Sequence, residues 1–106
     1  MKIRNHEMIR FLNASENLRK KKLPSKLYFA ISCNIKALIG FAEPYNEALD
    51  KAQAEGVAAV TELLNQEIDA AIQTVPKTIF EVLDSSDKFD ALTGDEIDAI
   101  LFMIEK

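Results

Sequence analysis

Residues 25–54 constrain the fold most, because apolar side chains recur through them at the spacing of a narrow helical seam. From Ile31 onward the steps between seam positions alternate between four and three residues. Ser25 follows Pro24 and is expected to be the N-cap, with its hydroxyl on an otherwise unpaired amide. The pattern predicts one long helix with the rest of the chain packed along it. Its seam positions are Leu27, Ile31, Ile35, Leu38, Ala42, Tyr45, Leu49 and Ala52.

A proline lies in the middle of this predicted helix. Pro44 removes one backbone hydrogen bond, and its ring presses on the carbonyl of Gly40, which has no side chain to resist an adjustment. Two outcomes are open: a continuous helix with a kink, or two helices that meet near residues 41–43. The seam keeps its phase through Pro44, so the kinked continuous helix is favoured.

A shorter helix is predicted over residues 5–22. Asn5 is expected to be its N-cap, and the carboxylate of Glu7 suits the positive end of the helix dipole. The basic run 19–22 suits the negative end. The predicted buried stripe consists of Met8, Phe11, Leu12, Ser15 and Leu18.

The middle of the chain carries weaker signals. An apolar stripe at Val57, Val60, Leu63 and Leu64 predicts a third helix, and Gly56 either separates it from the long helix or lies within a continuous one. Residues 67–75 fit either a strand or a helix. Their alternating apolar positions favour the strand, which would pair with residues 1–4 because a lone strand needs a partner. Residues 79–83 form an apolar cluster after Pro76, and a helical turn is expected there.

The clearest local signal is a capping box near the end of the chain. Thr93 is the expected N-cap and Glu96, three residues later, completes the box. Leu92 and Ile97 occupy the positions of a hydrophobic staple. A last helix is predicted from here to the end of the chain, with a buried stripe at Ile97, Ile100, Leu101 and Ile104.

Composition indicates a single globular domain, residues 1–106, with 48% apolar and 28% charged residues. No run approaches the roughly 20 apolar residues of a membrane span, and the polar N-terminus does not resemble a secretion signal. The formal charge of −4 is unevenly distributed: residues 1–36 carry +7 and residues 37–106 carry −11. We expect the basic part to lie against later acidic helices, in preference to forming a ligand-binding face. The expected fold class is mainly α, with antiparallel helices around one long Pro-kinked helix and a minor two-stranded β ladder.

The sequence offers no candidate catalytic, cofactor-binding or metal-binding residues. His6 and Cys33 are the only histidine and cysteine, so neither a disulfide nor a complete histidine or cysteine ligand set is expected. Cys33 is expected to be a partly buried structural thiol. The acids between residues 84 and 98 lack the calcium-loop spacing, and no glycine-rich phosphate loop is present. An enzyme is therefore not expected.

Several segments together resemble a family of small proteins encoded by phages and prophages of Gram-positive bacteria. They are the opening helix, the Leu-Pro-x-Lys-Leu turn at residues 23–27, the Pro-Tyr pair at 44–45 and the Leu-Thr-x-x-Glu start at 92–96. The resemblance implies a mainly helical accessory or morphogenesis protein without established catalytic or binding residues. The implied location is the host cytoplasm, with association with the virion as an alternative.

The expected function is non-enzymatic and depends on helix-mediated protein–protein contacts. The expected partner is another protein, which a second copy of the chain would satisfy by burying the seam beyond Gly40 in a homodimer. The alternative is a nucleic-acid-associated or regulatory protein that uses the basic surface at residues 19–26; membrane binding is not expected. The candidate interaction residues are Tyr45, Leu49 and Ala52 on the seam and Arg19, Lys20, Lys21 and Lys22 in the basic run.

Overall fold

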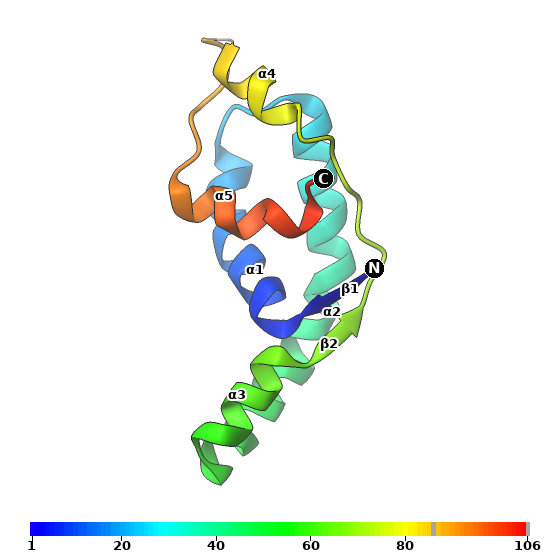
Figure 1. The fold of residues 1–106 in the computed structure, drawn as a ribbon, viewed down its shortest axis with the longest axis vertical. Helices are drawn as coiled ribbons and strands as arrows, with labels where there is room; N and C mark the ends of the chain where they lie inside the picture. Colours follow the sequence, from blue (N-terminus) through cyan, green and yellow to red (C-terminus); the bar gives the residue numbers. More distant parts are fainter. Residues whose placement is uncertain (86, 106) are drawn as a thin grey trace.

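A computed structural model describes residues 1–85 and 87–105, and within them the fold is mainly α, as expected. Helix α2 (Ser25–Glu55) runs almost the full 49 Å length of the molecule. Helix α1 (Asn5–Lys20) packs along its first half, and α3 (Val57–Asn65) folds back along its second half (Figure 1). The elements after α3 return toward the start of α2. They are β2 (Glu67–Asp69), α4 (Ile79–Ser85), α5 (Gly94–Ile100) and the 3₁₀ helix η1 (Leu101–Met103).

The core lies between α1, the first half of α2 and the C-terminal elements. Its fully buried side chains include Met8, Phe11 and Leu18 from α1, and Leu27, Ile31 and Leu38 from α2. Ile100 and Met103 close it from the other side. Phe11 and Phe102 meet edge to face, with ring centroids 5.2 Å apart. The predicted spacing of buried positions on α1 and α2 is therefore confirmed.

A short two-stranded ladder joins residues 2–4 to residues 67–69. Strand β1 (Lys2–Arg4) pairs antiparallel with β2, and Ile3 lies opposite Ile68. The strand interpretation of residues 67–75 is thus confirmed for its first three residues. The remainder runs extended to Val75, which forms a parallel bridge with Ile104.

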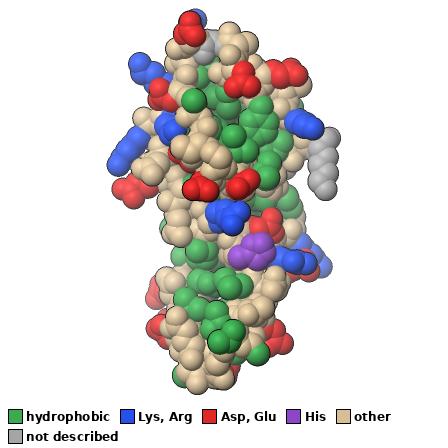
Figure 2. All heavy atoms as spheres, turned by 60° about the vertical axis from the view of Figure 1, so that its left-hand side comes forward, with side chains coloured by type: hydrophobic (Ala, Val, Ile, Leu, Met, Phe, Trp, Pro, Cys, Tyr) green, Lys and Arg blue, Asp and Glu red, His purple; other side chains and the backbone are tan. Residues whose placement is uncertain are grey.

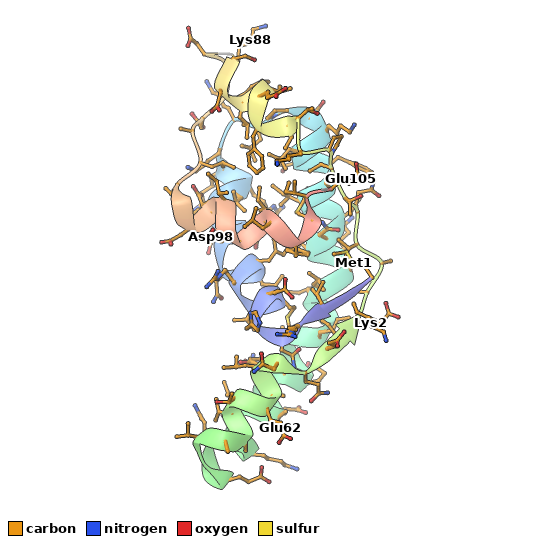
Figure 3. The ribbon with its side chains drawn as sticks, in the orientation of Figure 1. Met1, Lys2, Glu62, Lys88, Asp98 and Glu105 are labelled. Atoms are coloured by element: carbon orange, nitrogen blue, oxygen red, sulfur yellow. The ribbon has the colours of Figure 1, made fainter. Side chains whose placement is uncertain are left out.

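Helix α2 is continuous through Pro44, so the two-helix alternative is wrong, and the kink stays a prediction. Gly56 separates α2 from α3 with φ 122° and ψ 179°, a conformation that side-chain-bearing residues rarely adopt. The resulting α2–α3 hairpin projects beyond the start of α1 (Figure 1). Figure 3 shows the long shape of the molecule, with Glu62 on the hairpin and Lys88 at the opposite end.

Two predicted N-caps are wrong. Pro24 occupies the cap position of α2, and Ser25 is the first helical residue. Arg4 occupies the cap position of α1, where its amide donates to the Glu7 carboxylate at 3.0 Å. The side chain of Asn5 instead donates to the carbonyl of Leu63 at 2.9 Å, so it joins α1 to α3.

Helix ends and two apolar positions also differ from the predictions. Helix α1 ends at Lys20, because the backbone of Lys22 pairs with Asp90 instead of continuing the helix. The last helix ends at Ile100 and leads into η1, because the chain turns to pair with Val75. Leu101 is consequently exposed. Val57, at the turn of the hairpin, is exposed as well.

Candidate interaction surface

One side of the first half of α2 faces the core, and the opposite side is exposed and apolar. Leu27, Ile31 and Leu38 point inward at helical spacing. Tyr28, Phe29 and Ile39 lie off that stripe, and the side chains of Phe29 and Ile39 are 61% and 57% exposed. Three large hydrophobic side chains are thus exposed on the outer side of one helix.

Tyr28 and Phe29 border a shallow groove of about 580 Å³. Leu23 and Ser25 form its beginning, and residues one turn apart on α2 continue it. We call the groove together with Ile39 the α2 face. Its residues are Leu23, Ser25, Tyr28, Phe29, Ser32, Cys33, Lys36 and Ile39. Cys33 is half-buried within this face, as expected.

The stretch of chain that forms the α2 face and leads into it carries charge of one sign. Residues 17–42 contain six Lys or Arg residues and no Asp or Glu. Lys36 lines the groove, and Lys26 lies about one helical turn before Phe29 on the same helix. Among the described residues, no carboxylate lies within ion-pair distance of the side-chain ammonium groups of Lys22, Lys26 or Lys36. The face therefore combines apolar area with unneutralised positive charge.

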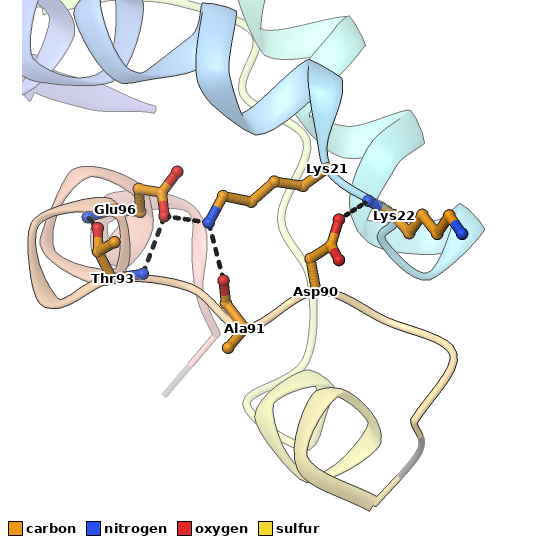
Figure 4. A network of polar contacts seen from close by, with 6 residues as sticks. All are labelled: Lys21, Lys22, Asp90, Ala91, Thr93 and Glu96. Carbon is orange, nitrogen blue, oxygen red and sulfur yellow. Dashed lines mark hydrogen bonds and ion pairs between the residues drawn. The ribbon is translucent and has the colours of Figure 1, made fainter.

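The predicted basic run contains one half-buried lysine, Lys21, and three exposed residues. Lys21 forms an ion pair with Glu96 at 2.8 Å and donates to the carbonyl of Ala91, also at 2.8 Å (Figure 4). Lys20 approaches Glu16 at 3.9 Å on the surface. Arg19 and Lys22 have exposed side chains. The expected contact between basic and acidic parts of the chain is therefore confirmed for Lys21.

Glu96 contacts both Lys21 and Thr93 (Figure 4). Its carboxylate accepts from Lys21 and from the amide of Thr93 at 2.9 Å, and its own amide donates to the Thr93 hydroxyl at 3.1 Å. The predicted capping box is thus present. Burial raises the pKa of Glu96, but the hydrogen bonds from Lys21 and Thr93 outweigh burial and hold the pKa below its ordinary value. The ion pair between Lys21 and Glu96 joins the turn after α1 to the first turn of α5.

The three seam residues predicted to make contacts between molecules are buried or half-buried by other parts of the same chain. Tyr45 and Ala52 are 8% and 6% exposed, and Leu49 is half-buried. Helix α3 lies against this half of α2, and Tyr45 belongs to the buried core cluster. A partner that contacted Tyr45 and Ala52 directly would have to displace the parts of the same chain that bury them.

A second groove, of about 820 Å³, lies between α1 and α5 and contains His6. Arg10 and Lys21 line it from α1 and the following turn, whereas Asp95 and Asp98 line it from α5. Figure 2 shows this side of the molecule, with both charge types and the histidine between two hydrophobic areas. His6 and Cys33 line different grooves. Residues 1–85 and 87–105 contain no group of three or more His, Cys, Asp or Glu side chains that could hold a metal ion.

The exposed residues of the α2 face were not predicted from the sequence. Tyr28, Phe29 and Ile39 do not belong to the seam, but the same helical spacing that selects the seam places them on the opposite side. The signal in the sequence was a set of large apolar residues that lie off the seam, in a stretch without acidic residues.

No helix in the described ranges is long and apolar enough to cross a membrane. No protein-family model, curated protein or solved structure matches the chain.

Proposed function

We propose that the chain is a non-enzymatic binding protein that acts through helix-mediated protein–protein contacts made by the α2 face. The observation that carries this proposal is the exposed apolar area of Tyr28, Phe29 and Ile39 on one side of one helix. Exposed apolar patches of more than roughly a few hundred Å² are uncommon on monomeric proteins and mark contact surfaces. Aromatic side chains are also enriched among the residues that dominate binding energy at interfaces. A groove along a helix suits a partner that inserts another helix.

A role as an accessory or morphogenesis protein of a phage or prophage is the biological part of this proposal. Its support is the resemblance of the chain to small phage proteins, together with a helical fold that presents an uncovered face. The proposed location is the host cytoplasm or the virion.

The test is affinity purification of the tagged protein from Gram-positive cells that carry its gene. Phe29→Asp should lose the protein recovered with the wild type, because a carboxylate replaces an exposed apolar contact. Leu101→Asp is the matched control, since Leu101 is 51% exposed on a different element. Circular dichroism establishes that both variants are folded. Recovery of the same partner by Phe29→Asp at the wild-type level would contradict the proposal.

A second candidate function is nucleic-acid binding, which one observation favours. Exposed aromatic rings at Tyr28 and Phe29 lie close in sequence to Lys22 and Lys26, and rings beside cations suit bases beside phosphates. Titration with single-stranded and duplex DNA at two salt concentrations separates the candidates. Micromolar affinity that falls steeply with salt and is lost on reversal of Lys22 and Lys26 would favour nucleic acid.

A further inference from the structure

Two neighbouring stretches of the chain carry opposite charges. Residues 43–67 hold six Asp or Glu residues and one Lys, in contrast to the basic, acid-free stretch 17–42. The basic stretch forms the end of α1, the turn and the first half of α2. The acidic stretch forms the second half of α2 and the whole of α3, which together make the hairpin.

The hairpin also presents apolar area at its tip. Val57 is 84% exposed beside Gly56, and Ala54 and Ala58 are exposed on either side of it. Figure 2 shows hydrophobic side chains gathered over this end of the molecule, with acidic side chains along its edges. No basic side chain of the described residues lies within ion-pair distance of Glu55 or Glu62. The tip thus combines apolar area with unneutralised negative charge, the counterpart of the α2 face.

These two surfaces cannot meet within one chain. Phe29 and Glu55 are separated along α2 by about 39 Å, at 1.5 Å per residue. Because α2 is a single continuous helix, it holds the two surfaces apart. A contact between them requires two molecules.

We propose that the chain associates head to tail: the hairpin tip of one copy, around Val57, docks on the α2 face of the next, around Phe29. This inference rests on the proposed function of the α2 face and adds the identity of the partner. The contact is heterologous, so a dimer keeps one free α2 face and one free hairpin tip, and growth continues until a ring closes or a filament forms. Lys26 and Lys36 face the carboxylates of the incoming hairpin, which selects a second copy over a neutral apolar partner.

Sedimentation velocity on the purified full chain tests the proposal. The wild-type weight-average mass should rise with concentration beyond that of a dimer. Association should weaken when salt is raised from about 0.1 M to about 1 M, where the screening length falls from about 10 Å to about 3 Å. Phe29→Asp and Val57→Asp should each weaken association more than tenfold, whereas Leu101→Asp should associate like the wild type. All three positions are exposed, so the variants should fold, and circular dichroism checks this.

A mixture of Phe29→Asp and Val57→Asp tests directly whether the tip of one copy binds the α2 face of another. Phe29→Asp keeps an intact hairpin tip and Val57→Asp keeps an intact α2 face, so an equimolar mixture should form heterodimers that grow no further. A wild type that stays monomeric at all concentrations would overturn the proposal, as would a mixture that stays monomeric. Binding of the monomer to anionic vesicles or DNA through Phe29, without self-association, would also overturn it. A monomeric wild type that still recovers a different protein from cells through Phe29 would refute head-to-tail association alone and leave the proposed function intact.

Discussion

The buried side chain of Asn34 forms two hydrogen bonds with the backbone of Gln73. The amide of Gln73 donates to Oδ1 of Asn34 at 2.7 Å, and Nδ2 of Asn34 donates to the carbonyl of Gln73 at 2.9 Å. The side-chain amide thereby provides the pair of hydrogen bonds that a neighbouring strand would supply. It fixes the extended segment that follows β2 against α2, and Nδ2 also lies 3.4 Å from the sulfur of Met103.

Replacing Asn34 should therefore destabilise the fold. Asn34→Leu leaves the amide and carbonyl of Gln73 without their partner, and we expect the free energy of unfolding to fall by about 1–3 kcal/mol. Asn46→Leu is the matched control, because Asn46 is exposed on the same helix and its replacement should change stability by no more than about 0.5 kcal/mol. Urea denaturation of both variants measures the difference. Equal midpoints would show that the Gln73 backbone gains nothing from Asn34.

Glu96 should make stability depend on acid pH. Because the pKa of Glu96 is lower in the folded chain than its ordinary value of 4.5, its ionised form stabilises the fold above that pH. This contribution is lost as the pH falls through the lowered pKa. Glu96→Gln should accordingly lower stability at neutral pH and reduce the loss of stability on acidification. Urea midpoints across the acid range measure this, with Asp98→Asn, an exposed carboxylate on the same helix, as the control. Parallel pH curves for wild type and Glu96→Gln would contradict the assignment.

The capping box at the start of α5 should contribute measurably to stability. Thr93→Ala removes the hydroxyl that accepts from the amide of Glu96, and a loss of about 1 kcal/mol is expected. Leu92→Ala should add a smaller loss, because the staple with Ile97 is only half-buried. Thr61→Ala, in the exposed middle of α3, is the control and should change stability little. Chemical denaturation measures the change in the free energy of unfolding. An unchanged midpoint for Thr93→Ala would show that the stability of α5 does not depend on its cap.

Patterns of residues close together in the sequence were sufficient to predict which helices form, but not where each helix ends. The seam of α2 and the Thr93 box depend on residues a few positions apart, so the sequence alone predicted them. The true ends of α1 and of the last helix depend on Asp90 and Val75, which are distant in sequence and could not be recognised from a helical pattern. The role of Asn34 was hidden for the same reason, since its partner lies thirty-nine residues later. None of the seven interaction residues chosen from the sequence belongs to the α2 face, because the choice followed the seam and the basic run and not the exposed apolar side opposite the seam.

Two glycines, Gly40 inside α2 and Gly56 at its end, should respond in opposite ways to substitution by alanine. Gly56 has φ 122° and ψ 179°, a region almost restricted to glycine, so Gly56→Ala should cost about 1–3 kcal/mol even though no atom lies near enough to clash. Gly40 lies inside α2 with open space around it, so Gly40→Ala should stabilise the protein by about 0.5–1 kcal/mol. Thermal and urea unfolding of both variants compare the two effects. Hydrogen exchange in α3 adds a local measurement, because strain at Gly56 should loosen the turn that folds α3 back along α2. A Gly56→Ala variant as stable as the wild type, with unchanged exchange in α3, would mean that the turn adopts another conformation than the one described.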